Sequence, residues 1–88
     1  MKPDTKTDVT ARLRSIEGHL KAVERMVEED KYCVDVLRQT MAIEKALERV
    51  DAMILEGHLE TCVADQFRDG KGERTIKELT EIFRTDRR

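Results

Sequence analysis

Hydrophobic positions recur every three or four residues along most of the chain, which is the spacing of one face of an α-helix. The first such series comprises Val9, Leu13, Ile16, Leu20, Val23 and Val27. No segment shows the strict alternation of apolar and polar residues that is typical of a half-buried strand. The pattern predicts a first helix over about 7–29 with this series as its buried face, preceded by a flexible basic tail over 1–6.

A second apolar series runs from Val34 to Leu55 and covers more than one side of a helix, so we expect a long helix over about 32–64 that packs on several neighbours. The polar, glycine-containing stretch 65–72 is the strongest loop signal. The apolar residues beyond it predict a third helix over about 73–84; they are Ile76, Leu79, Ile82 and Phe83.

Gly57 interrupts the predicted second helix, where glycine costs up to about 1 kcal/mol relative to alanine. A helix bend and a close approach of another segment would each account for it, and both stay open.

The composition favours a single small all-α domain over 1–88. The chain has 88 residues, of which 41% are charged and 3% aromatic. A helix over 32–64 would be about 50 Å long, whereas a globule of this length is roughly 30 Å across. We therefore expect an oligomer. No apolar run is long enough for a membrane span and no secretory signal is evident, so we expect a cytoplasmic protein with reduced thiols.

The two cysteines and one of the two histidines have a distinctive spacing. His58 and Cys62 are four residues apart and share one helix face. Cys33 falls on nearly the same face but roughly 37 Å away along a continuous helix, too far for one metal ion. Two antiparallel copies of the helix would place Cys33 of one copy opposite His58 and Cys62 of the other. The spacing thus predicts two intersubunit sites per dimer.

Two thiolates and one imidazole form a soft set of three donors, which suits trigonal Cu(I) better than a four-coordinate zinc site. Zinc with a water as fourth ligand stays open. Each residue alone has a plainer interpretation, a buried cysteine or a surface histidine. The three together favour copper, whereas His19, which has no cysteine in register, is expected to be a partly exposed helix residue.

Four segments resemble the CsoR family of copper-sensitive operon repressors. They are the run Arg12-Leu13-Arg14-Ser15-Ile16-Glu17-Gly18-His19, the pair Tyr32-Cys33, the run Glu48-Arg49-Val50, and the pair His58-x-x-x-Cys62. The resemblance covers nearly the whole chain. It implies an antiparallel all-α dimer of dimers without a helix-turn-helix, Cu(I) between protomers, and Tyr32 and Glu78 as outer partners of the ligands.

Relatives of this kind that sense other inducers differ at the same positions. Nickel and cobalt sensors of the family resemble this chain but have a histidine-enriched set of ligands and a further ligand near the N-terminus, where this chain has Pro3. Formaldehyde sensors usually lack the cysteine found here as Cys62, and persulfide sensors lack the histidine found here as His58. Copper is therefore the first choice of inducer, and a thiol-reactive inducer, a persulfide or an aldehyde, is the alternative.

DNA binding has to be reconciled with a formal net charge of −2. On a helical wheel Arg14, Lys21 and Arg25 fall within about 40° of one another, with Arg12 at the edge of the apolar stripe. Glutamates flank these residues, so a solvated helix face is an equally good interpretation from charge alone. The resemblance implies that Arg12 and Arg49 bind DNA, with Arg14, Lys21, Arg25 and Lys45 as phosphate contacts.

The resemblance also implies negative allostery, in which the apo-protein represses and Cu(I) binding releases operator DNA. An enzyme is not expected, because the chain has few aromatic residues, no glycine-rich loop and no evident oxyanion donors.

Overall fold

The computed structural model describes residues 1–86, and all of its regular elements are helices. They are α1 (Pro3–Glu28), α2 (Cys33–His58), a π-helical segment η1 (Leu59–Val63), α3 (Ala64–Arg68) and α4 (Gly72–Asp86). The predicted all-α class is confirmed. The second predicted helix is continuous in space, but its last part is a π turn followed by the short helix α3.

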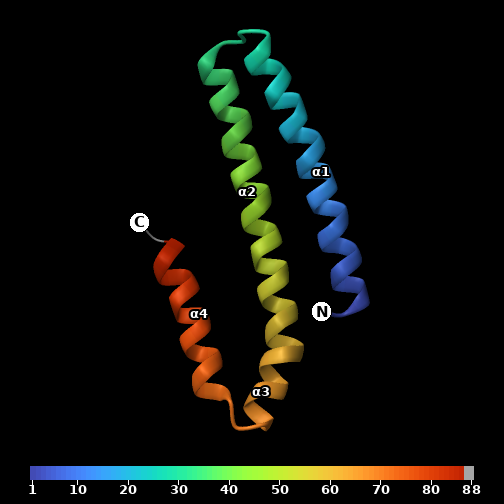
Figure 1. Cartoon of the computed structure of the whole chain (residues 1–88). Coiled ribbons are helices and arrows are strands. Elements are labelled where there is room, and N and C mark those ends of the chain that lie inside the picture. The colour runs from blue at the N-terminus through green and yellow to red at the C-terminus, as the bar shows by residue number, and fades with distance from the viewer. Residues whose placement is uncertain (87–88) are drawn as a thin grey trace.

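α1 and α2 form an antiparallel hairpin, and α4 runs back beside the second half of α2, on the side away from α1 (Figure 1). The chain measures 55 × 31 × 13 Å. Because an α-helix with its side chains is about 10–12 Å thick, the helices lie in a single layer. Among the described residues, a single copy therefore buries only a few apolar side chains.

The α1–α2 turn satisfies the end of α1 through a Schellman motif. The amide of Asp30 donates to Val27 O at 3.1 Å and that of Lys31 to Met26 O at 2.9 Å. Asp30 adopts the left-handed conformation, with φ = 54°, a conformation that this motif requires at the residue after the cap. The same pattern ends α3, where Gly70 takes the left-handed position with φ = 77°.

Two predicted boundaries are wrong. α1 begins at Pro3 rather than near residue 7, because proline lacks the amide hydrogen that the first helical position leaves unpaired and already has a helical φ. The expected tail over 1–6 is thus reduced to two residues. The expected loop over 65–72 is shortened to 69–71, because residues 64–68 continue the helix.

The predicted buried face of α1 is only partly buried. Val9 and Val23 are 5% exposed and pack in the hairpin with Ile43 and Val50 of α2. Leu13, Leu20 and Val27, however, are 38%, 47% and 58% exposed. No helix in residues 1–86 is both long enough and apolar enough to cross a membrane.

Candidate metal centre and nucleic-acid interface

The three candidate ligands lie at the two ends of α2. Cys33 is its first residue and is exposed, as is the preceding Tyr32. His58 is its last residue and is half-buried, and Cys62 lies in η1 and is exposed. Cys33 and His58 are 25 positions apart in the sequence, which separates them by roughly 37 Å along the helix. The structure thus keeps His58 and Cys62 at one end and Cys33 at the other.

Within the described residues of one chain, no group of three His, Cys, Asp or Glu side chains lies close enough together to hold a metal ion. One chain offers a thiol and an imidazole at one end of α2 and a second thiol at the other. This donor chemistry fits a soft cation such as Cu(I), provided that a second chain supplies the missing thiol.

Between the two nearer candidates the helix changes its hydrogen bonding, which the apolar spacing does not reveal. Leu59–Val63 form a π turn. Thr61 Oγ1 donates to Gly57 O at 2.8 Å, the same carbonyl to which the Thr61 amide would donate in an α-helix. Single π turns inside α-helices are frequent at functional sites. The expected α-helical register of His58 and Cys62 is therefore corrected to a π register.

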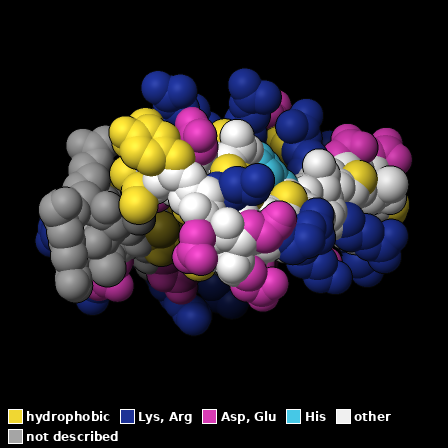
Figure 2. Space-filling model, turned by 90° about the horizontal axis from the view of Figure 1, so that it is seen from above, with side chains coloured by type: hydrophobic (Ala, Val, Ile, Leu, Met, Phe, Trp, Pro, Cys, Tyr) yellow, Lys and Arg dark blue, Asp and Glu magenta, His cyan; other side chains and the backbone are white. Residues whose placement is uncertain are grey.

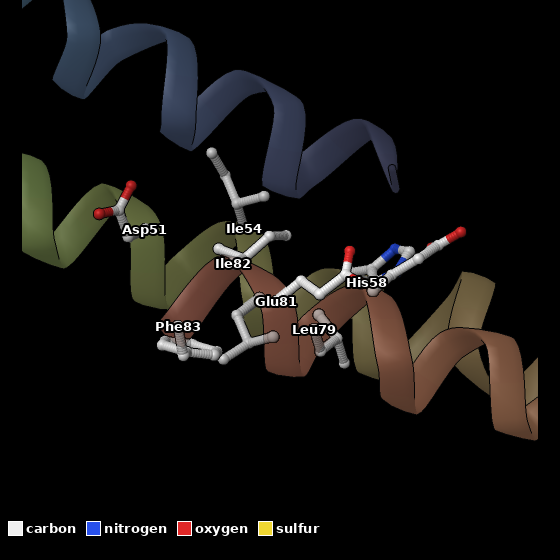
Figure 3. Close-up of a pocket in the computed structure, with 9 residues that line it drawn as sticks. Asp51, Ile54, His58, Leu79, Glu81, Ile82 and Phe83 are labelled. Atoms are coloured by element: carbon white, nitrogen blue, oxygen red, sulfur yellow. The ribbon is translucent and has the colours of Figure 1, made fainter. Parts of the chain in front are cut away.

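His58 lies at one end of a groove of about 880 Å³ between α2 and α4 (Figure 3). Its walls are mostly apolar, with Ile54 on α2 and Leu79, Ile82 and Phe83 on α4. Glu78, one of the two expected outer partners, also lines this groove and accepts a hydrogen bond from Arg74 Nε at 3.1 Å. Tyr32, the other expected partner, is at the opposite end of α2.

His19 lies apart from these groups. Its Nε2 is 2.7 Å from Gln39 Oε1, so it joins α1 to α2 as a half-buried residue, which confirms the expectation of a partly exposed helix residue.

The six basic residues that were expected to contact DNA are all exposed. Four of them are on α1 and two on α2; they are Arg12, Arg14, Lys21, Arg25, Lys45 and Arg49. Within the described residues the ion pairs join Lys2 to Glu60, Arg68 to Asp65 and Arg74 to Glu78, so none of the six is engaged. Lys and Arg side chains gather on the α1 side of the molecule, at the right in Figure 2, beside acidic ones.

Sequence reasoning missed Thr5, Thr61 and the role of Gly57. A methyl group at Gly57 would lie 3.2 Å from Thr5 Cγ2, so α1 approaches α2 closely at this point. Of the two explanations for Gly57, the structure supports the close approach. Glycine inside a helix was the available signal, whereas nothing in the sequence pointed to Thr5.

The family model described as metal-sensitive transcriptional repressor matches residues 5–85. The chain is 43% identical, over 90% of its length and 78% of the relative's, to the copper-sensing transcriptional repressor CsoR of Bacillus subtilis (strain 168). The chain spans 78% of the length of this relative and 61% of the length of the copper-sensing transcriptional repressor CsoR of Mycobacterium bovis (strain BCG / Pasteur 1173P2), to which it is 44% identical.

Two solved structures are similar over most of the chain. The copper-sensing repressor CsoR with Cu(I) from Geobacillus thermodenitrificans NG80-2 superposes with a TM-score of 0.91 at 35% identity, covering 100% of this chain and 92% of that one. The nickel-responsive transcriptional regulator InrS gives a TM-score of 0.72 at 35% identity, covering 90% and 89%. The matched family consists of transcriptional repressors and not of enzymes. The chain belongs to the family of metal-sensitive transcriptional repressors.

Proposed function

We propose that this protein is a copper(I)-responsive transcriptional repressor of the cytoplasm. The apo form binds operator DNA, and binding of Cu(I) releases it and derepresses genes for copper efflux or buffering. The metal ligands are Cys33 of one protomer and His58 and Cys62 of the other. The observation that carries this proposal is the distribution of one soft donor at the start of α2 and two at its end.

The exposed apolar residues support a second copy as the partner. Leu13, Leu20 and Val27 are seven residues apart, the repeat of a helix seam that packs against another helix. In a single layer of helices this seam is exposed to solvent. An antiparallel pair of hairpins covers it and brings opposite ends of α2 together. We extend this to a dimer of dimers, the assembly that the family resemblance implies.

In this arrangement the protein's own residues have separate tasks. Cys33, His58 and Cys62 bind the cation, and Tyr32 and Glu78 orient the imidazole from outside. Arg12 and Arg49 bind operator DNA, and Arg14, Lys21, Arg25 and Lys45 contact its phosphates. Bound Cu(I) supplies a fixed link between protomers, and linkage requires that DNA weaken Cu(I) binding by the factor by which Cu(I) weakens DNA binding.

A mixing experiment tests the intersubunit site. Cys33→Ser and Cys62→Ser proteins are each titrated with Cu(I) against a chelator, alone and after being unfolded and refolded together. A mixed dimer has one intact site, because Cys33 comes from the second variant and His58 and Cys62 from the first. Random mixing restores about one quarter of the wild-type sites, since about half of the dimers are mixed. An unchanged titration after mixing contradicts a shared site.

The second candidate is a repressor of the same family whose thiols react with a persulfide or an aldehyde. It is favoured by the exposure of both Cys33 and Cys62, which are free thiols. The wild-type protein separates the two functions. Release of DNA by Cu(I) under anaerobic, reducing conditions supports the copper sensor, and release only after covalent modification of Cys33 supports the alternative.

A further inference from the structure

The N-terminal turn of α1 rests on the part of the chain that carries two of the proposed ligands. A methyl group at Gly57 would meet Thr5 at 3.2 Å from Cγ2 and 3.6 Å from Oγ1. Contacts of 3.0–3.4 Å are tighter than nine in ten real Cβ contacts, so α1 sits here at a separation that only glycine permits without adjustment. Gly57 is buried, and His58 follows it directly.

The same glycine is fixed on its other side by η1. Its carbonyl accepts the Thr61 hydroxyl at 2.8 Å, and Cys62 is the next residue. A third contact lies nearby, where Lys2 Nζ is 3.4 Å from Glu60 Oε2. The first turn of α1 thus touches the helix just before His58 and the π turn that contains Cys62.

α1 also carries four of the six basic residues proposed to contact DNA, the nearest in sequence being Arg12. A helix moves as a stiff rod over this length. A π turn holds one residue more than an α turn, so a change of η1 to the α hydrogen-bond pattern would rotate the residues that follow it. A change of that kind acts directly on Gly57 and, through the tight contact, on Thr5.

We propose that the contact between Gly57 and Thr5 is the link through which occupation of the His58–Cys62 end of α2 repositions α1 and its basic residues. This inference rests on the proposed function. Gly57 and Thr5 are positioning residues in it, since neither side chain offers a soft ligand or a basic contact to DNA.

A complementary change of size tests the link. Gly57→Ala adds a methyl group in tight contact with Thr5, and the double variant Gly57→Ala/Thr5→Ala removes the atoms that it meets. Thr5→Ala alone opens the contact and leaves the sequence of α2 unchanged. The test therefore does not depend on the folding of a single variant. The matched control is Gly18→Ala, also in a helix, where a methyl group meets no atom within 4 Å.

The first readout is amide hydrogen exchange with and without Cu(I), measured on the reduced 88-residue chain. In the wild type and in Gly18→Ala, Cu(I) slows exchange in both η1 and residues 5–9 of α1. In Gly57→Ala and Thr5→Ala the slowing remains in η1 and is lost in α1, and the double variant regains it. Slowing of α1 in Gly57→Ala equal to that in the wild type overturns the proposed link.

The second readout is the ratio of the dissociation constants for a duplex from upstream of the protein's own gene, with and without Cu(I). A typical allosteric coupling predicts a ratio of about 5–150 for the wild type. The ratio falls toward 1 in Gly57→Ala and recovers in the double variant. A ratio of 1 in the wild type overturns the proposed function, and the exchange measurement then still decides whether the contact between Gly57 and Thr5 links η1 to α1. A ratio in Gly57→Ala equal to that in the wild type overturns the link and leaves the proposed function standing.

Discussion

The hydroxyl of Thr61 donates a 2.8 Å hydrogen bond to the carbonyl of Gly57, one turn back along the helix. The acceptor is the carbonyl to which the Thr61 amide would donate in an α-helix. The following residue is Cys62, whose Sγ is 3.7 Å from the same hydroxyl. The thiol of Cys62 therefore lies beside the hydroxyl of its neighbour.

Thr61→Val, which keeps the shape of the side chain and removes the hydroxyl, is expected to lower Cu(I) affinity about 10-fold, within the range seen when an outer partner of a ligand is lost. It also costs about 0.5–1.5 kcal/mol of stability for the lost hydrogen bond. Chelator competition measures the first effect and denaturant unfolding the second. Thr61→Ser, which retains the hydroxyl, serves as the control, and equal Cu(I) affinity in the two variants refutes this role of Thr61.

His58→Ala is expected to retain much of the Cu(I) affinity through the two thiolates and to lose release from DNA. The reason is that an imidazole binds metal through one nitrogen and passes orientation to an outer partner through the other. Chelator competition and DNA anisotropy are measured on the same preparation. Normal Cu(I)-driven release in this variant excludes a relay through His58.

Arg12→Ala and Arg49→Ala are expected to weaken DNA binding and to leave Cu(I) affinity unchanged. Loss of a cationic side chain from the interface lowers the slope of log K against log salt, by up to about 0.9 where that side chain neutralises a phosphate. The control is Arg68→Gln, on α3, where the arginine is exposed and paired with Asp65. Equal salt slopes in all three variants would show that DNA binds elsewhere. Loss of DNA binding with intact Cu(I) binding also distinguishes a regulator from a copper store.

The apparent affinity for Cu(I) is expected to rise with pH, because the metal displaces the protons of the cysteine thiols. The dependence is measured by competition at several pH values with a chelator of known protonation behaviour. Cys33→Ser removes one of the two thiols and is expected to flatten the dependence. A wild-type affinity independent of pH between 6 and 8 argues against thiolate ligands.

Gly18→Ala is expected to raise the free energy of unfolding by about 0.5–1 kcal/mol, because Gly18 lies inside α1 and its substituent meets open space. Denaturant unfolding at a fixed protein concentration measures the change, since an oligomer's stability depends on concentration. A loss of stability would mean that another copy packs against this side of α1.

The sequence was sufficient for the helical elements because each has a long apolar series. The three soft donors stay a prediction that rests on their types and spacing. The errors of the sequence-based prediction lie where one contact or one hydrogen bond decides the structure. Pro3 starts α1 earlier than the apolar series does. Gln66 and Thr75 are hydrogen-bonded across the α3–α4 turn, and Lys71 donates to Gln66 O at 2.7 Å, which holds a compact turn within the expected loop.

In the candidate site, too, the sequence pattern predicted where residues lie along the helices but not the single contacts between them. The α-helical spacing predicted that His58 and Cys62 lie together at one end of the second helix, but a hydrophobic pattern does not record the π turn that contains Cys62 or the hydrogen bond of the Thr61 hydroxyl. Gly57 stood out in the sequence as a glycine inside a predicted helix. Explaining it required the position of Thr5, 52 residues earlier in the chain. Contacts between distant residues have no signature in a local pattern.

The most direct test of the account is anaerobic fluorescence anisotropy of the reduced protein on the DNA upstream of its own gene, titrated with Cu(I) at fixed salt. The account predicts tight binding of the apo-protein and release that is complete near one Cu(I) per protomer. DNA binding that Cu(I) leaves unchanged would contradict the copper sensor, and the absence of DNA binding by the apo-protein would contradict the proposed apo-repressor mechanism.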